Sequence, residues 1–203
     1  MKTLKAKSGA FLMLIMVLFA SGMFYGCNKN EFLNQQISIS TNSTTILPAF
    51  SIGQTYGGGI IFWLDSSGKH GLIAATSDQG YNWWGDRYYL LTGATGTAVG
   101  TGSGNTKKIV TVLGSKYDYA ALICTKYRGG DYVDWFLPSK DELFLLYKQK
   151  SVVGGFIRGG YWSSSEYVTQ FDHTLAWQKY FYNDVSTLTH KDRFDGIRAI
   201  RAF

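Results

Sequence analysis

Hydrophobic and polar residues alternate in short blocks along the chain, and the block boundaries predict the elements of one domain. In the segment 57–75 (GGGIIFWLDSSGKHGLIAA), two apolar runs flank the turn residues 65–68. Two apolar runs around such a turn predict a β-hairpin. The chain closes on 197–203 (IRAIRAF), where Ile197 and Ile200 predict burial on a terminal strand, with arginines interleaved.

Helical patterns occupy the middle of the chain. Apolar residues and closing glycines predict short helices over 105–113 and 118–127. The segment DWFLPSKDELFLLYKQK contains Ser139 followed three residues later by Glu142, the spacing of a capping box that starts a helix. Three apolar residues of this helix share the face that we expect to be buried: Leu143, Leu146 and Tyr147.

The N-terminus has the parts of a bacterial lipoprotein signal. Three lysines precede an unbroken apolar run over 11–20, and a Gly-Cys pair ends at Cys27. We therefore expect a cleaved signal over 1–26, lipidation of Cys27, a polar tether over 27–52 and one extracytoplasmic domain over 53–203. The alternative is an uncleaved anchor helix; either arrangement tethers the domain to a membrane.

Charge and cysteine content narrow the function classes. Removing the three signal lysines leaves 20 − 3 = 17 Lys and Arg against 14 Asp and Glu, a scattered net charge of +3. A nucleic-acid partner is not expected, because such proteins concentrate their basic residues on one face. With Cys27 lipidated, Cys124 stands alone, so no disulfide framework forms, and we expect a buried thiol in a helix.

No residue set predicts a cofactor or a metal. The Gly/Thr-rich loop TGATGTAVGTGSGN lacks the Gly-Lys-Ser/Thr ending of a phosphate-binding loop. The histidines at positions 70, 173 and 190 lack the spacing of a metal or acid–base set, and the serines 163–165 lack the glycines of a nucleophile elbow. We expect the acidic residues around the capped helix, at 131, 134, 141 and 142, to act in turns and caps.

Several landmarks in fixed order resemble the Lcl C-terminal domain family, bacterial C-type-lectin-like domains related in fold to formylglycine-generating enzymes. They are GGGIIFWLDSSGKHGLIAA, Trp83-Trp84-Gly85, DWFLPSKDELFLLY, YWSSSE, Ala176-Trp177 and IRAIRAF. The resemblance covers about residues 53–203. It implies an α+β fold with paired terminal strands, two to three short helices and a loop-rich lower half. It also implies binding rather than catalysis, so no enzyme is expected; a formylglycine-generating-type enzyme is a remote alternative.

The stretch 167–197 resembles the variable region of proteins diversified by retroelements. Every residue over 180–190 is a type that randomised adenines in an asparagine codon can encode. The competing interpretation is that such residues simply favour strands. The aromatic residues offer rigid contact area and the polar ones adaptable contacts. The predicted ligand-binding residues are Tyr167, Phe171, Asp172, His173, Tyr180, Tyr182, Asp184, Thr187, His190 and Phe194.

Burial should separate framework from binding residues in this stretch. We expect Trp162, Trp177 and Phe181 to pack in the interior. We also expect Trp177 and Ile200 to lie buried beneath one exposed face, formed by Tyr180, Tyr182, Asp184, Thr187 and His190.

The sequence is compatible with two main functions. The first is a surface-displayed receptor or adhesin, anchored to the membrane by lipid, for a protein or glycan ligand on another cell, a phage or a matrix. The second is a glycan-capture lipoprotein of a polysaccharide uptake system, with Trp83, Trp84 and Tyr88 as a stacking platform. For both, the outer membrane and cell surface are the expected location.

Overall fold

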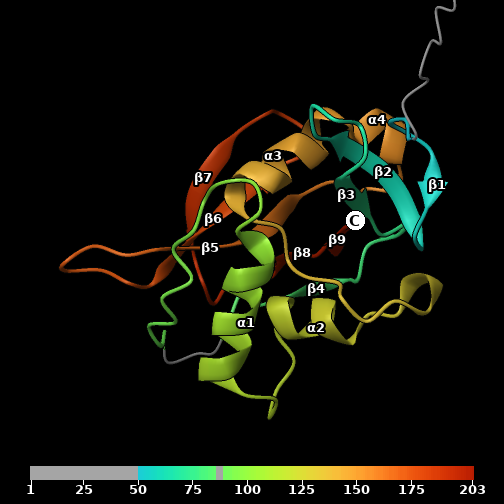
Figure 1. Cartoon of the computed structure of the whole chain (residues 1–203). Helices are drawn as coiled ribbons and strands as arrows, with labels where there is room; N and C mark the ends of the chain where they lie inside the picture. The colour runs from blue at the N-terminus through green and yellow to red at the C-terminus, as the bar shows by residue number, and fades with distance from the viewer. Residues whose placement is uncertain (1–49, 86–88) are drawn as a thin grey trace, which may run out of the picture. The chain divides into compact units, whose positions relative to one another are not determined.

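The computed structural model describes residues 50–85 and 89–203, and this part of the chain forms an α+β fold with two sheets (Figure 1). The first sheet has the order β1 (Thr55–Tyr56), β2 (Gly59–Leu64), β3 (Gly71–Ala74) and β9 (Ile200–Ala202). The second has the order β4 (Tyr81–Asn82), β8 (Asp195–Gly196), β5 (Gly160–Tyr167), β6 (Leu175–Tyr180) and β7 (Ser186–His190). Signal residues 1–26 and Cys27 lie outside the described residues.

The predicted hairpin is confirmed. Strands β2 and β3 pair antiparallel, and Asp65 accepts hydrogen bonds from the backbone N–H and hydroxyl of Ser67 in the turn. The C-terminal strand β9 pairs antiparallel with β3, whereas β1 pairs with β2. The expected pairing of the terminal strands is therefore wrong: β1 and β9 lie at opposite edges of one sheet. Phe50, which the sequence analysis assigns to the tether, packs its ring 4.8 Å from Phe203.

The helices follow the local signals in the sequence. They are α1 (Gly102–Leu113), α2 (Ala120–Lys126), α3 (Lys140–Lys148) and α4 (Lys150–Val153), with a 3₁₀ turn over Gly129–Asp131. The capping box at the start of α3 is confirmed: Ser139 Oγ accepts from the Glu142 N–H, and the Glu142 carboxylate accepts from the Ser139 N–H. Within the described residues, no helix is both long and apolar enough to span a membrane.

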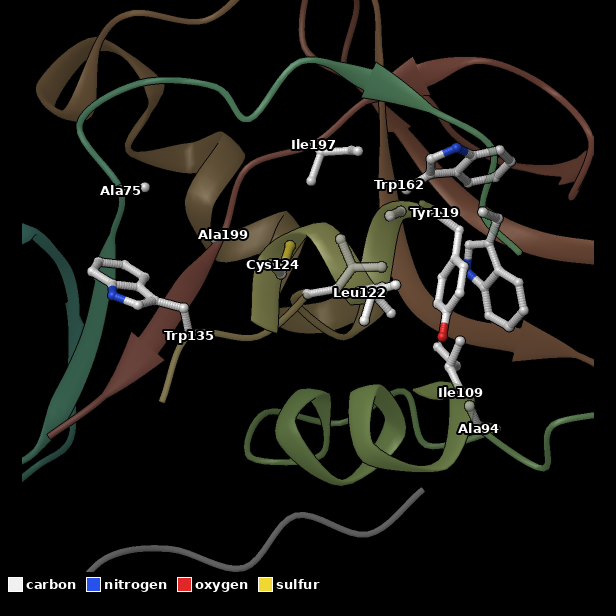
Figure 2. Packing of buried hydrophobic residues seen from close by; sticks show 14 of the residues in the cluster. Ala75, Ala94, Ile109, Tyr119, Leu122, Cys124, Trp135, Trp162, Ile197 and Ala199 are labelled. Carbon is white, nitrogen blue, oxygen red and sulfur yellow. The ribbon is translucent and has the colours of Figure 1, made fainter. Parts of the chain in front are cut away.

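Two clusters of buried side chains form the core. One gathers around α2 and includes Trp84, Trp135 and Trp162, together with Cys124, whose thiol is fully buried as predicted (Figure 2). The other gathers side chains from both sheets and α3, among them Leu143 and Tyr161. Both sheets are therefore supported by helices, which leaves their connecting loops free to carry binding residues.

Burial confirms most of the predicted framework and corrects one residue. Trp162, Phe181 and Ile200 are buried. The prediction for Trp177 is wrong, because this side chain is only half-buried. Its ring lies at the start of α3, where Lys140 Nζ sits 4.9 Å from the ring centroid and Tyr167 meets its edge. Helix α3 and these long side chains shield the indole without enclosing it.

Candidate functional site

The predicted binding residues lie at opposite ends of the five-stranded sheet. Strands β5, β6 and β7 are consecutive and antiparallel. Their connections therefore alternate: residues 168–174 and 191–194 lie at one end, which we name the loop end. Residues 181–185 lie at the other, which we name the hairpin end. Five residue steps along β6 separate the two ends by about 17 Å, so no single small ligand can contact both.

The loop end gathers six of the ten predicted residues. They are Tyr167, Phe171, Asp172, His173, His190 and Phe194. The loop 168–174 projects from the sheet (Figure 1, orange), and Phe171 in it is 90% exposed. Phe194 is 55% exposed and meets the ring of Trp83 edge-on at 4.8 Å. Both rings are therefore accessible to a partner.

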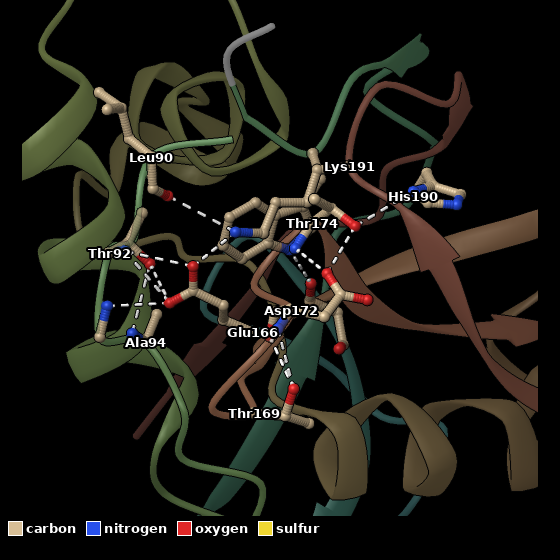
Figure 3. Close-up of polar contacts among 12 residues, drawn as sticks. Leu90, Thr92, Ala94, Glu166, Thr169, Asp172, Thr174, His190 and Lys191 are labelled. Atoms are coloured by element: carbon tan, nitrogen blue, oxygen red, sulfur yellow. Dashed lines mark hydrogen bonds and ion pairs between the residues drawn. The ribbon is translucent and has the colours of Figure 1, made fainter. Parts of the chain in front are cut away.

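Hydrogen bonds within the projecting loop hold its shape. The Thr169 N–H donates to the Asp172 carbonyl, and the Asp172 N–H donates back to Thr169 Oγ1. Asp172 Oδ1 accepts from the backbone N–H and the hydroxyl of Thr174 (Figure 3). These bonds from Thr174, helped by the charges of His190 and His173, hold the pKa of the Asp172 carboxyl below its usual value. The loop therefore presents Phe171 from a defined turn.

A buried ion pair fastens the loop end to the core. Lys191 Nζ contacts Glu166 Oε1 at 2.5 Å, with both side chains buried, and lies 4.8 Å from the Trp84 ring centroid. The Glu166 carboxylate also accepts from Thr92 and from the Gly93 N–H (Figure 3). The pair thus joins β5, the residue after β7 and the Gly/Thr-rich loop. Sequence reasoning missed it, because no local pattern connects the two residues.

The alternative stacking platform is not formed as predicted. Trp84 is fully buried, and its indole N–H donates to the Ser163 carbonyl at 2.7 Å. Burial of that ring corrects its assignment as a sugar-stacking residue. Trp83 is half-buried against Phe194, so it belongs to the loop end, and Tyr88 lies outside the described residues.

The hairpin end carries Tyr180, Tyr182 and Asp184. Tyr182 is 54% exposed, and its ring centroid lies 5.4 Å from that of Tyr180, which is half-buried. Asp184 pairs with the buried Lys179 Nζ, which lies between the hairpin and the rings of α3. This pair fixes the turn between β6 and β7.

The prediction that five residues share one exposed face is wrong. Thr187 pairs with Gln178 and His190 with Leu175, in a strand without a bulge. Residues three apart on a regular strand point to opposite faces. Tyr180 and Thr187 are half-buried, whereas Tyr182, Asp184 and His190 are exposed.

The polar residues that resemble catalytic motifs act in the scaffold. The three serines of β5 are buried: Ser163 Oγ donates to the Trp177 carbonyl, and Ser165 Oγ donates to the Gly96 carbonyl. Asp134 does not cap a turn but pairs with Arg201 at 2.7 Å, which lowers the pKa of its carboxyl. Burial raises the pKa of the Cys124 thiol, which disfavours a thiolate nucleophile.

The Gly/Thr-rich loop is filled by side chains of the protein itself. Its amides at Thr92 and Gly93 donate to Glu166, and its amide at Gly100 donates to Glu142. Two carboxylates thus occupy donors that a phosphate would need. In the described part of the chain, no group of three or more His, Cys, Asp and Glu side chains could hold a metal ion.

Comparison with known proteins finds no match, either among protein-family models or among curated proteins.

Proposed function

We propose that this chain is a membrane-anchored, extracytoplasmic lipoprotein whose C-type-lectin-like domain binds a protein or glycan ligand on another cell, a phage or a matrix. The binding surface is the loop end, with Phe171 and Phe194 as its aromatic contacts. The hypervariable origin suggested for residues 167–197 and the Lcl family membership are part of the same proposal.

The observation that carries the proposal is the exposure of Phe171, 90% in a loop that is itself ordered by hydrogen bonds. A large apolar ring held outward loses little entropy on binding and gains contact area when a partner covers it. The surrounding polar groups, Asp172, His173 and His190, supply adaptable hydrogen bonds. This combination resembles the paratopes of binding proteins more than a catalytic centre.

The loop end is also held rigidly by contacts with the core, which supports a role in binding. The buried Glu166–Lys191 pair and the aromatic contact between Trp83 and Phe194 fix both loops of the loop end. Binding loops on a rigid scaffold pay less ordering cost when the partner docks. Substitution on the exposed positions should therefore change ligand choice and leave the fold intact, because surface changes usually alter stability by about 0.5 kcal/mol or less.

The test is a combined Phe171→Ser and His173→Ser variant, measured by binding to intact cells and glycan arrays and by thermal melting. Phe194 is left unchanged, because its contact with Trp83 supports the loop end. We expect binding to fall at least tenfold, a loss of about 1.4 kcal/mol or more, with an unchanged melting temperature. A Tyr117→Ser and Val133→Ser variant is the matched control, since both residues are exposed apolar side chains elsewhere, 67% and 70%. Unchanged binding by the loop-end variant would refute this location.

A further inference from the structure

Strand β7 is a long free edge of the five-stranded sheet. It pairs with β6 on one side and, among the described residues, with no strand on the other (Figure 1). The edge strands β4 and β1 have only two residues each. The edge strand β9 is covered by a bridge between Ile200 and Phe136. In the described part of the chain, β7 is therefore the edge best able to accept another strand.

The sequence of β7, STLTH, has none of the usual protections of an edge. Natural edge strands are often blunted by lysine, proline or a bulge, which prevent another strand from pairing there. Strand β7 contains neither lysine nor proline, and its register with β6 runs without a shift from residue 186 to residue 190. An unprotected edge of five residues is a template for strand addition by a partner.

The outward backbone groups of β7 belong to Ser186, Leu188 and His190. On either side of these residues, the Tyr180 N–H donates to the Val185 carbonyl and the Lys191 N–H donates to the Thr174 carbonyl. Hydrogen-bonded pairs alternate along an antiparallel ladder, so residues 185, 187, 189 and 191 face β6 and the even-numbered residues face away. The Leu188 and His190 carbonyls accept only local bonds, from the Thr187 hydroxyl and the Arg193 N–H, and each keeps a second lone pair.

This edge is complementary to itself. Two copies of β7 that run antiparallel about a two-fold axis at Leu188 place residue 186 opposite residue 190 and pair the two Leu188 backbones. Thr187 then lies opposite Thr189, a favourable cross-strand pair, and no lysine, arginine or acid lies opposite another. A two-fold contact of this kind closes, so it forms a dimer and not a fibre.

The two ends of the sheet carry opposite unpaired charges. At the hairpin end, Lys150 and Arg158 form no ion pair with a described residue, whereas Asp184 is engaged by Lys179. At the loop end, Asp172 and Asp192 likewise form no ion pair within the described residues, whereas Arg193 is engaged by Asp195. Antiparallel pairing brings the hairpin end of one copy beside the loop end of the other. The charges of the two ends therefore attract across the pairing.

We propose that β7 pairs with β7 of a second copy of this chain, antiparallel with Leu188 at the two-fold axis. The hairpin end, with its exposed Tyr182, then extends the loop-end surface of the partner. The two groups of predicted binding residues, which lie far apart within one chain, thus meet between two chains. The pairing does not depend on the proposed function, whereas this shared binding surface rests on it. A lipid anchor favours the pairing, because it concentrates the copies on one membrane.

Cysteine cross-linking of the full-length chain in isolated membranes tests the register. Hydrogen-bonded antiparallel pairs have Cα atoms about 5.5 Å apart, which a disulfide can span. Leu188→Cys should therefore give a disulfide-linked dimer under a mild oxidant, seen by non-reducing electrophoresis. Ser186→Cys is the matched control: this position is more exposed, but its two copies would lie about 13 Å apart, too far for a disulfide. Wild type gives the background, since Cys124 is buried.

A mixed pair tests the same register without altering Leu188. Chains with Ser186→Cys should cross-link to chains with His190→Cys. Adding Leu188→Lys to both should abolish this product, because two lysines then lie opposite each other at the axis. Val112→Lys, at a 43% exposed residue of α1, adds the same charge elsewhere and should leave the product intact. Thermal melting of each variant checks that the domain stays folded.

The shared surface is tested by cell binding. Tyr182→Ser should weaken binding about fivefold, the size of an aromatic contact, and should have no effect when Leu188→Lys is also present. An equal effect in both backgrounds overturns the shared surface.

Equal cross-linking at 186 and 188 overturns the pairing, as does failure of both Leu188→Cys and the mixed pair. Cross-linking of Leu188→Cys to a different protein assigns the edge to that partner and overturns the choice of a second copy. If the cross-links form but the Phe171→Ser and His173→Ser variant keeps its cell binding, the pairing stands and the proposed function fails. If no cross-link forms while that variant loses cell binding, the pairing fails and the proposed function stands.

Discussion

Replacing Asp195 by asparagine should stabilise the domain at neutral pH. This carboxyl is 4% exposed, and its Oδ2 has no hydrogen-bond partner in the described part of the chain. Arg193 lies 3.9 Å away but is itself largely exposed, so it offsets the burial only in part. Burial of the charge, opposed by Arg193 and Gln178, raises the pKa of Asp195 from 3.8 to about 6.

The size of this stabilisation and its pH dependence follow from the difference between the pKa of Asp195 in the native state and in the unfolded chain. One pKa unit corresponds to about 1.4 kcal/mol, so a rise from 3.8 to about 6 makes the ionised carboxylate cost about 3 kcal/mol in the native state. The native state holds its proton to higher pH than the unfolded chain does. The free energy of unfolding therefore falls as the pH rises from about 4 to about 6, and the full cost remains above pH 6.

The assay is urea unfolding followed by tryptophan fluorescence, at pH 7.5 and at pH 4. Asp195→Asn has no proton to lose, so its gain over wild type should approach 3 kcal/mol at pH 7.5 and shrink to about 0.5 kcal/mol at pH 4. Asp192→Asn, on an exposed neighbour, is the control and should change stability little at either pH. A gain of equal size at both pH values, or a loss at pH 7.5, would refute the reasoning.

Three further predictions test the scaffold and the anchor. Ser139→Ala should lower the free energy of unfolding by about 0.5–2 kcal/mol through loss of the helix cap, measured by urea unfolding, with glycan and cell binding unchanged. Lys191→Met should lower it by about 3–5 kcal/mol, because it leaves Glu166 buried and unpaired; adding Glu166→Gln should recover part of that loss. Cys27→Ser should release the chain from membranes in fractionation, whereas unchanged partitioning would contradict lipid anchoring.

Local signals in the sequence predicted the local structure well. The turn of the β2–β3 hairpin and the capping box of α3 act between residues two or three positions apart, so their chemistry is visible in a short segment. The α+β class was what the resemblance to C-type-lectin-like domains implied, and the observed helices and sheets confirm this class. The sequence also predicted part of the loop surface. The exposed aromatic residues at 171, 182 and 194 do lie on connections of one sheet.

The contacts that position the candidate site could not be predicted in this way. The long-range ion pairs join residues 25, 67 and 120 positions apart, namely Glu166–Lys191, Asp134–Arg201 and Asp78–Arg198. Neither partner of such a pair lies in a pattern that points to the other. The expectation of one binding face failed for a related reason: it ignored that consecutive strand connections alternate between the two ends of a sheet.

The structure also limits which positions of the segment 180–190 can vary freely. Phe181 is buried against the rings of Tyr161 and Phe156, and the Thr189 hydroxyl donates to the buried Gln178. Random substitution there would open a cavity or leave a buried amide unpaired, and each change costs folding free energy. If a retroelement diversifies this segment, the functional variants should keep large apolar side chains at 181 and hydroxyl side chains at 189. Diversity should then concentrate at 182, 183, 185 and 186, in the exposed turn of the hairpin end, whereas Asp184 should be kept as the partner of the buried Lys179.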